Sequence, residues 1–598
     1  MVNRNEVNLK ETWDLTHLFQ TETDFEKQIE VVKLDSVDIT TTFKGKIYNV
    51  QSILNVIERY EKLLEKLVPI NSYANLILSV DQGNDEAQLR AAKVGQLFST
   101  ISAQTSFIIS ELVEIDEITL QEASNISPEY ANFIQKIIRK KPYQLHPEAE
   151  RALAAFGTTF DAPYELYNTT KLVDLQFHQF EVNGNSYPLS YNSFEGDWEL
   201  ENNTEIRRAA FEAFSQKLKD YQHTTAKTYD MYLKIEKTNA DLRGYNSIFD
   251  YLLFNQEVDQ SLYHRQIDII MKELAPHMRR YAKLLQRVHG LDDMTFADLK
   301  ISLDPTYEPQ ISIEESRKFM KDALSIMGEE YSDMIDRAFE ERWIDFAQNT
   351  GKSTGAFCDS PYGYHPYVLI SWTNRMNEVF VLAHELGHAG HFNLANAKQN
   401  VFNAEPSLYF IEAPSTMNEM LMANYLLNNS TDTRFKRWVI STIVARTYYH
   451  NFVTHLLEAA YQRKVYEEID QGGSVNANKL NELKRNVLKE FWGDTVKIID
   501  GAELTWMRQP HYYMGLYPYT YSAGLTIATQ VYRRIQTDGK LAIDDWLKVL
   551  KAGGTKNPYE LAQMAGIDLT SEQPLRDTIS FIGSLVDQLE QLTEQLGQ

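Results

Sequence analysis

The chain has 598 residues and a mass of 69.2 kDa, which is too long for one small hydrophobic core. It carries 83 acidic and 59 basic residues, and its net charge of −24 disfavours partners with a phosphate backbone or an anionic lipid surface. A lone cysteine excludes an intrachain disulfide framework and any metal site built from cysteines alone.

The chain shows neither a secretory h-region near its first residues nor an apolar stretch of about 18 residues. We therefore expect a soluble, cytoplasmic protein that binds neither nucleic acid nor membrane. Apolar residues recur at three-to-four spacing in many segments, so the sequence predicts a mainly α fold. The clearest predicted helices span 48–68, 262–289 with a bend at Pro276, and 580–596.

Strand signals are few, and the strongest is a hairpin near 175–193. Short alternating segments there flank Asn183-Gly184, a dipeptide that favours a two-residue turn between antiparallel strands. No repeat, low-complexity tract or Gly/Ser linker marks a boundary elsewhere. We therefore place a seam at the hairpin and predict an N-terminal helical region, 1–195, followed by a second region, 196–598, that carries the chemistry.

The segment 379–395 contains the motif H-E-L-G-H at its centre. Residues four apart on a helix project from one face, so His384 and His388 can together hold one Zn²⁺ at about 2.0–2.1 Å. Glu385 lies beside that face and can reach a water on the metal rather than the metal itself. The motif therefore predicts a metal site; a chance match, with both histidines bonded to other partners, is the alternative.

A catalytic zinc site needs three protein ligands and one open position, so a third ligand must come from elsewhere in the chain. His391 follows His388 by three residues, but that spacing places it poorly for the same ion. The acidic candidates downstream are Glu405 and Glu412, and Glu419 lies two helical turns after Glu412. We favour Glu412 as the ligand and Glu419 as the hydrogen-bond partner of a ligand histidine, with Glu405 as the alternative ligand.

These motifs resemble those of the M3 metallopeptidases, which include thimet oligopeptidase and the bacterial oligoendopeptidase F group. H-E-L-G-H is followed 24 residues after His388 by E-A-P-S and then by Glu419. K-S-T-G-A-F-C at 352–358, Y-V-L-I-S-W just ahead of the zinc helix, and the tyrosine-rich run 511–524 fit the bacterial branch. The resemblance implies an elongated, mainly α bowl of two lobes around a deep channel, with a small β-sheet beside the zinc helix.

The resemblance also implies the composition of the site. It implies one Zn²⁺ per chain held by His384, His388 and Glu412. It implies that Glu385 is the general base that activates a zinc-bound water. Glu419 would then support a ligand histidine.

The run 511–524 resembles the family's substrate loop. The resemblance implies that His511 and one or more of Tyr517, Tyr519 and Tyr521 contact the substrate. Gly and Pro within the run argue against one regular helix, and donors on such a loop can stabilise an oxyanion. For any one tyrosine, the alternative is a core aromatic whose hydroxyl has another partner.

A short apolar run at 366–372 predicts a strand just ahead of the zinc helix. If its edge is exposed, an extended peptide can add to it as a further strand, which would explain tolerance of many side chains. The alternative is an ordinary strand of a small sheet.

Together these features predict a zinc-dependent endopeptidase that hydrolyses internal bonds of short, unstructured oligopeptides. One alternative is a zinc carboxypeptidase or another exopeptidase with the same metal site. A second is a peptide-binding protein with a structural zinc, although structural sites use four protein ligands.

Overall fold

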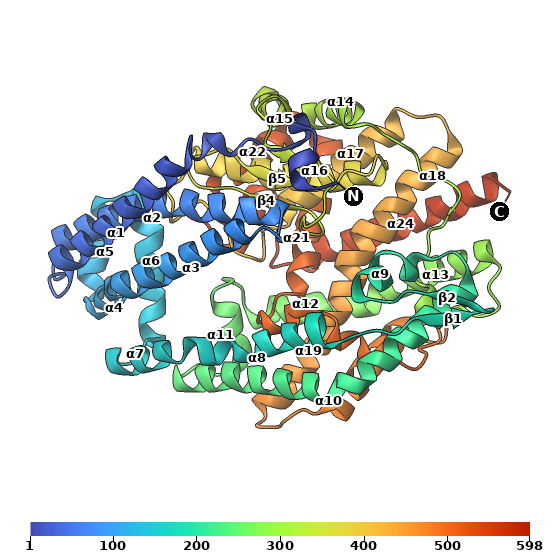
Figure 1. The fold of residues 1–598 in the computed structure, drawn as a ribbon, viewed down its shortest axis with the longest axis horizontal. Helices are drawn as coiled ribbons and strands as arrows, with labels where there is room; N and C mark the ends of the chain where they lie inside the picture. The colour runs from blue at the N-terminus through green and yellow to red at the C-terminus, as the bar shows by residue number, and fades with distance from the viewer. Residues whose placement is uncertain (1, 598) are drawn as a thin grey trace.

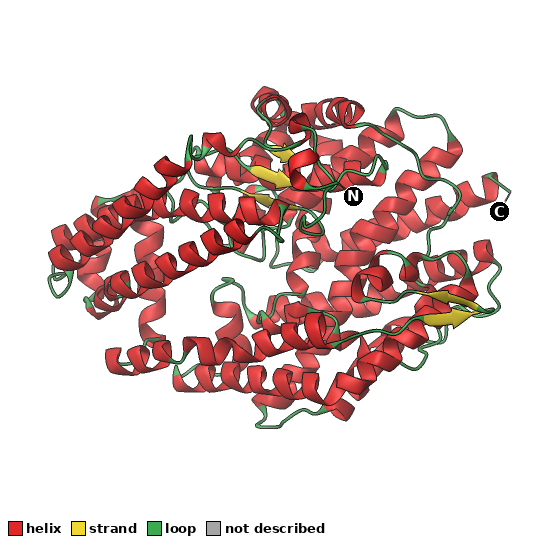
Figure 2. Ribbon diagram, viewed as in Figure 1, coloured by secondary structure: helices red, strands yellow, loops and turns green. Residues whose placement is uncertain are grey.

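The computed structural model describes residues 2–597. Helices take up 71% of it and strands 3%, so the predicted mainly α class is confirmed (Figure 2). Figure 1 shows the helices arranged in an upper and a lower half. Helices cross between the two halves on the right of the view, and one N-terminal helix crosses on the left. Among the described residues, none of the helices combines the length and the apolar character that crossing a lipid bilayer requires.

The N-terminal helices form the left end of the upper half in Figure 1. They are α1 (Glu22–Phe43), α2 (Val50–Val80), α3 (Asp85–Thr105), α4 (Phe107–Glu114), α5 (Glu117–Ile126) and α6 (Ala131–Lys140). Asn49 begins α2 with a capping box, and the helix runs on through Pro69, well beyond the predicted end at 68. The apolar faces of these helices pack into a hydrophobic core of their own.

The chain next builds the lower half, returns to the upper half, and enters the lower half once more near residue 455 (Figure 1). The helices of this first stretch are α7 (Pro147–Ala155), α8 (Gly157–Thr169), α9 (Tyr191–Gly196), α10 (Thr204–Leu242), α11 (Ile248–Phe254), α12 (Gln260–Ile269) and α13 (Ala275–His289). Those that follow are α14 (Ile313–Leu324), α15 (Glu329–Glu340), α16 (Asn377–Asn396), α17 (Ala413–Asn428), α18 (Thr433–Thr442), α19 (His455–Asp470), α20 (Ala477–Trp492), α21 (Tyr519–Asp538), α22 (Lys540–Ala552), α23 (Pro558–Met564) and α24 (Gln573–Gln595).

The predicted hairpin is confirmed. Strands β1 (Phe180–Val182) and β2 (Asn185–Tyr187) pair antiparallel around Asn183-Gly184. Both turn residues have positive φ, 52° and 79°, as the tight turn between twisted strands requires. The predicted helix at 262–289 is two helices, α12 and α13, joined by a π-helical turn at Ile270–Leu274 that ends just before Pro276.

A three-stranded sheet lies beside α16, as predicted. Its order is β3 (Ile344–Asp345), β5 (Tyr367–Leu369) and β4 (Phe357–Asp359), with β5 parallel to β3 and antiparallel to β4. The predicted strand at 366–372 is therefore real, but the prediction that it presents an exposed edge is wrong. Both of its edges are hydrogen-bonded, and β4 is the edge strand that lies next to α16.

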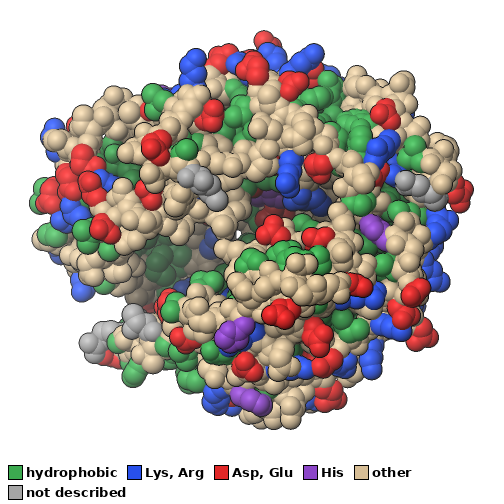
Figure 3. Space-filling model, turned by 45° about the vertical axis from the view of Figure 1, so that its right-hand side comes forward, with side chains coloured by type: hydrophobic (Ala, Val, Ile, Leu, Met, Phe, Trp, Pro, Cys, Tyr) green, Lys and Arg blue, Asp and Glu red, His purple; other side chains and the backbone are tan. Residues whose placement is uncertain are grey.

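Strand β5 also joins two hydrophobic cores. Successive side chains of a strand point to opposite faces. Tyr367 and Leu369 pack into the core of the N-terminal helices, whereas Val368 packs into a larger core that takes in the helices from α8 to α24. The division of the chain near residue 195 stays a prediction. Figure 3 shows the surface hollowed between the halves, with basic and histidine side chains inside the hollow.

Candidate metal centre

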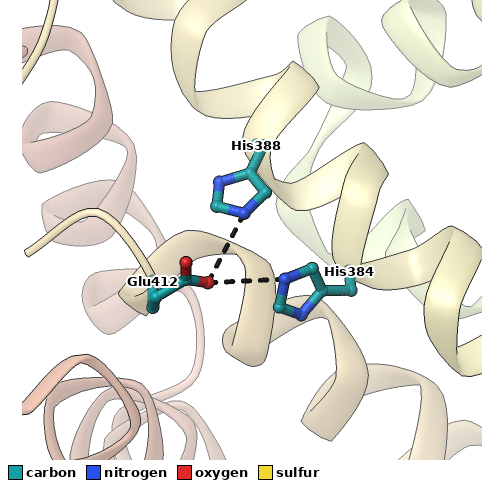
Figure 4. A group of neighbouring side chains, drawn as sticks. All are labelled: His384, His388 and Glu412. Atoms are coloured by element: carbon teal, nitrogen blue, oxygen red, sulfur yellow. Dashed lines mark ion pairs between the residues drawn. The ribbon is translucent and has the colours of Figure 1, made fainter. Parts of the chain in front are cut away.

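Helix α16 and the start of helix α17 carry the predicted metal ligands. Buried apolar side chains such as Leu382 and Leu394 hold α16 in the core on both sides of the motif. Helix α17 begins just after Glu412, with Pro414 in its first turn. Proline is tolerated there because backbone N–H groups in the first turn have no acceptor within the helix. The two helices pack together, which brings Glu412 to the histidine-bearing face of α16 (Figure 4).

His384, His388 and Glu412 converge on one point in Figure 4. Oε2 of Glu412 lies 3.4 Å from Nε2 of His384 and 3.5 Å from Nε2 of His388. The two imidazole rings stand nearly perpendicular, at 78°, with centroids 5.0 Å apart. The three residues that the sequence predicts as ligands therefore lie within reach of a single ion.

These separations fit a shared metal ion better than direct hydrogen bonds. A tetrahedral ion with bonds of about 2.0–2.1 Å holds two of its ligand atoms about 3.4 Å apart. Two imidazole nitrogens and a carboxylate oxygen form a donor set that suits Zn²⁺. Three protein ligands also leave a fourth position open, which is typical of catalytic rather than structural sites.

Neighbouring hydrogen bonds orient these ligands. Nδ1 of His384 lies 2.7 Å from Oε1 of Glu419, and the hydroxyl of Thr447 donates to Oε2 of the same carboxylate. With its proton on Nδ1, His384 keeps the lone pair of Nε2 for a metal. Ser415 donates to Oε2 of Glu412 at 2.9 Å and fixes that carboxylate in turn.

The charges of the group reinforce one another. Burial opposes ionisation of Glu412, but His388 and His384 hold its pKa well below the usual range. Burial also opposes a charge on His384, but the nearby carboxylates of Glu412 and Glu419 raise its pKa well above the usual value. Ionised carboxylates around basic imidazoles form a site that a divalent cation can fill in place of protons.

Glu385 lies beside the ligands but has no partner of its own. Its side chain is only 6% exposed, and it forms no hydrogen bond or ion pair with any residue from 2 to 597. Burial raises the pKa of Glu385, and the negative charges of Glu412 and Glu419 raise it further. His384 and His388 lower this pKa, but by less than the other effects raise it. A buried, unpartnered carboxylate with a raised pKa is suited to taking up and returning a proton.

His511, Tyr517 and Tyr521 form an aromatic group that faces the metal ligands. The ring of Tyr517 stacks on His511 with centroids 5.2 Å apart, and Tyr521 lies edge-on to Tyr517 at 5.5 Å. The two tyrosines share a hydrogen bond, and burial and the charge of Glu412 raise the pKa of both. Their hydroxyls therefore stay protonated at neutral pH and can act as donors.

Close packing of α21 against α17 brings this group to the metal ligands. A Cβ atom on Gly524, in the second turn of α21, would lie 2.9 Å from Cβ of Glu412. As predicted, the run 511–524 is not one regular helix, and it divides at Pro518. The part before it is a short 3₁₀ helix, Pro510–Tyr513, followed by an irregular segment, and α21 begins at Tyr519. Gly524 lies inside α21, where its missing side chain allows close helix contact rather than a turn.

Tyr519 is not part of the aromatic group. It is fully buried, its hydroxyl donates to Oε1 of Gln256 at 2.5 Å, and its ring lies edge-on to Tyr263 at 4.9 Å. It matches the alternative of a core aromatic with a satisfied hydroxyl.

The two alternative ligands also lie elsewhere. His391 is fully buried against Phe392 and Phe410, and among the described residues neither of its ring nitrogens has a partner. Burial and His388 lower its pKa to about 3, so the ring is neutral. Glu405 is exposed and does not join the cluster of possible ligands.

The fold brings several further residues to the site that are not among the predicted ones. Thr447 lies in a π-helical segment, Ile443–Thr454, and donates a hydrogen bond to Glu419. No local sequence pattern indicates this contact. His455 and Glu458 pack against the aromatic group, and their spacing of three residues on one helix is a signal that the sequence does contain. Ser415 is part of the E-A-P-S motif, and its contact with Glu412 follows from the start of the helix.

The chain is similar to known proteins along its whole length. The model of peptidase family M3 matches residues 199–581, and the model described as oligopeptidase F matches residues 111–177. Oligopeptidase PepF of Bacillus subtilis is 27% identical over 601 aligned residues, which cover 100% of this chain and 89% of the relative. An oligoendopeptidase F homolog of Borreliella burgdorferi is also 27% identical, with 99% of this chain and 100% of the relative covered.

Solved structures share the fold. A candidate peptidase from Chlamydophila abortus superposes with a TM-score of 0.87 at 24% identity, covering 99% of this chain and 100% of the other. Oligoendopeptidase F from Enterococcus faecium gives a TM-score of 0.75 at 22% identity, covering 96% and 99%. Because the family model spans well over half of its length, the chain belongs to peptidase family M3, in its oligoendopeptidase F group, and is a metalloendopeptidase.

Proposed function

We propose that the protein is a zinc-dependent endopeptidase that hydrolyses internal bonds of short, unstructured oligopeptides, with Glu385 as the general base. The observation that carries the proposal is a buried carboxylate without a partner beside a cluster of three metal donors. The names of the relatives, oligopeptidase and oligoendopeptidase, support peptides rather than folded proteins as substrates.

His384, His388 and Glu412 would hold the metal ion. When bound, a zinc-type ion supplies a Lewis acid that lowers the pKa of a water and polarises a carbonyl group. Glu419 keeps His384 in the tautomer that binds metal, and Ser415 fixes the ligand oxygen of Glu412. The carboxylates Glu412 and Glu419 also keep the site attractive to a cation.

Glu385 moves the protons of the reaction. Its carboxylate takes a proton from the attacking water and delivers it to the leaving amine once the peptide bond breaks. The raised pKa of Glu385 lies closer to neutral pH than the pKa of an exposed glutamate. A carboxylate with such a pKa can both accept the proton of the water and release it to the amine. No covalent acyl-enzyme is needed in this scheme.

The aromatic group would stabilise the substrate carbonyl as it gains negative charge. The hydroxyls of Tyr517 and Tyr521 remain protonated at neutral pH. The charge of Glu412 helps to raise the pKa of both, which is expected for side chains that lie near the metal ligands. His511 stacks on Tyr517, and burial lowers its pKa to about 4, so it contributes as a neutral donor. Donors fixed before the reaction stabilise an oxyanion without reorganising.

Strand β4 would receive the peptide. It is the edge of the sheet nearest α16, and Cys358 within it lies close enough to Glu385 for the charge of that carboxylate to add to burial in raising the pKa of the thiol. A peptide that adds to this edge is held by its main chain, which leaves its side chains largely unselected. The peptide bond would then pass beside the metal ligands and Glu385.

An internally quenched peptide blocked at both ends tests the proposal. We expect the protein to cleave it, to lose the activity on dialysis against a chelator, and to regain it with stoichiometric Zn²⁺. An exopeptidase would need a free terminus and would leave this peptide intact. Cleavage that persists in the metal-free protein would contradict the metal mechanism.

A further inference from the structure

A second group of polar side chains packs against the ring of Tyr521. Its centre is His455, the first residue of α19, with Glu458 one turn later. Both are almost completely buried, with 1% and 4% of their surfaces exposed. Neither residue has a part in the mechanism described above.

Hydrogen bonds hold the imidazole of His455 at both nitrogens. Nδ1 lies 2.7 Å from Oε2 of Glu458, and Nε2 lies 3.0 Å from Nε2 of His450. Burial opposes ionisation of Glu458, but His455 and Lys484 lower its pKa to about 2, so it is an acceptor at neutral pH. The hydrogen-bond pattern thus assigns the proton of His455 to Nδ1 and leaves Nε2 to accept from His450.

His455, Glu458 and His511 also lie close enough together to be considered as metal ligands. The distance from His455 to Glu458 argues against an ion. At 2.7 Å it is a direct hydrogen bond, whereas the donors of the metal centre stand 3.4 Å and 3.5 Å apart. The group is therefore a hydrogen-bonded support rather than a second metal site.

The immobilised ring of His455 packs against the aromatic group. It stacks on Tyr521 with centroids 4.0 Å apart and planes 12° apart, and it lies edge-on to His511 at 5.1 Å. Tyr521 in turn contacts Tyr517, and His511 stacks on Tyr517. Any rotation of His455 would therefore displace the tyrosine hydroxyls near Glu412.

Stability alone does not explain this arrangement. Burying a carboxylate and an imidazole is unfavourable, and well-packed apolar side chains of similar volume usually stabilise a core at least as well. A polar network fixes orientation where an apolar contact would let the ring rotate. A fixed orientation is what a donor to a transition state requires, because displacements of about 1 Å can lower rates by about 10²-fold.

We propose that His455, held by Glu458, is a positioning residue that fixes Tyr521 for catalysis. Its hydrogen bonds and ring contacts go to Glu458, His450, His511 and Tyr521 and to none of the three metal ligands, so it acts through the ring of Tyr521. This inference rests on the proposed function, in which the hydroxyl of Tyr521 contributes to the reaction.

The experiment compares His455→Phe and His455→Ala with the wild-type protein on the doubly blocked peptide. Phenylalanine fills the space but makes neither hydrogen bond, so it decides the question even if the alanine variant fails to fold. We expect kcat to fall about 10–100-fold, KM to change less than threefold, and metal content to stay at one ion per chain. A loss of less than fivefold in kcat for the folded variants would overturn the proposal.

A double-mutant cycle with Tyr521→Phe distinguishes positioning from general damage. If His455 acts through the hydroxyl of Tyr521, His455→Phe in the Tyr521→Phe background lowers kcat less than threefold further. If His455→Phe lowers kcat by the same factor in the Tyr521→Phe background as in the wild-type protein, its effect is independent of Tyr521, and the proposal is overturned. The matched control is His264→Phe, since His264 packs against Tyr263 and Phe249 at 5.2 Å, and it should leave kcat unchanged.

The outcomes separate the two proposals. A zinc-loaded wild-type protein that does not cut the blocked peptide would overturn the proposed function and this inference with it. An active wild-type protein, an impaired Tyr521→Phe variant and unimpaired His455 variants would overturn the positioning role alone. Near wild-type kcat in Tyr521→Phe would likewise overturn it, while the metal mechanism would stand.

Discussion

Gly387 and Ser415 meet so closely that no side chain fits between them. A Cβ atom on Gly387 would lie 2.5 Å from Cα of Ser415 and 2.5 Å from the carbonyl oxygen of Pro414. This contact joins the middle of α16 to the first turn of α17. It therefore sets the distance between the two histidines on one helix and Glu412 at the start of the other.

Gly387→Ala should separate the two helices and weaken the metal centre. The methyl group meets backbone atoms, which cannot rotate away, and overpacking of this kind typically destabilises by about 1–3 kcal/mol. We expect a lower melting temperature and a weaker affinity for Zn²⁺, measured by thermal melts and by competition with a chelator.

Gly95→Ala is the matched control, because Gly95 also lies inside a helix, α3, but has nothing within 4 Å of its Cβ position. Alanine has the higher helix propensity, so this variant should be neutral or slightly more stable. Equal behaviour of the two variants would contradict the role assigned to the contact of α16 with α17.

The part of the site that local spacing encodes could be predicted from the sequence. His384, Glu385 and His388 lie within five residues on one helix, and the periodicity of that helix sets their directions. The sequence favours Glu412 over Glu405 as the third ligand because E-A-P-S, with Pro414 in a first helical turn, marks the start of a helix at Glu412. The hairpin at Asn183-Gly184 was encoded locally in the same way.

The rest depends on contacts between distant segments. Strand β4 is short and half-buried, and only its pairing with β5 shows which strand is the sheet edge. Thr447 reaches Glu419 from a π-helical segment, a rare conformation that no residue pattern in 443–454 announces. Gly524 looks like a turn residue in the sequence, yet it serves close packing against Glu412 inside a helix.

Glu385→Gln should abolish turnover while keeping the metal. The amide has nearly the same shape but cannot take the proton of water, and loss of a general base typically lowers the rate by about 10²–10⁴-fold. Hydrolysis of the blocked peptide and metal content should be measured on the same sample. Glu405→Gln is the control, since Glu405 is exposed and outside the ligand cluster. Substantial activity in zinc-loaded Glu385→Gln would rule out the general-base role.

Glu412→Ala should weaken zinc binding more than any other single carboxylate change near the site. It removes a ligand, whereas Glu419→Ala removes only the hydrogen bond to His384, a type of change that typically weakens metal affinity about 10–100-fold. Glu405→Ala should bind zinc like the wild type. Competition titrations with a chromogenic chelator give the order of the three affinities. Loss of zinc from Glu405→Ala but not from Glu412→Ala would reverse the ligand assignment.

Substrates should have to be short and unstructured. The metal donors and Glu385 are mostly buried, and a peptide that adds to β4 must be extended along its main chain. A folded protein cannot offer such a segment without local unfolding. Mass spectrometry of a peptide mixture and of a stable folded protein, treated side by side, checks this. Efficient internal cleavage of the native protein would contradict it.

Tyr517→Phe, Tyr521→Phe and His511→Ala should each lower kcat with little change in KM. The group faces Glu412, and its donors act mainly on charge that develops in the transition state, so the loss of one should lower kcat by about 10²–10³-fold. Tyr519→Phe is the internal control from the same run of sequence. Its hydroxyl donates to Gln256 inside the core, so its loss should lower stability by about 1 kcal/mol and leave kcat nearly intact. Steady-state kinetics and thermal melts on the four variants separate the two kinds of tyrosine. If Tyr519→Phe impairs kcat as much as Tyr521→Phe, the effect comes from packing of α21 as a whole, and the aromatic group has no special part in the reaction.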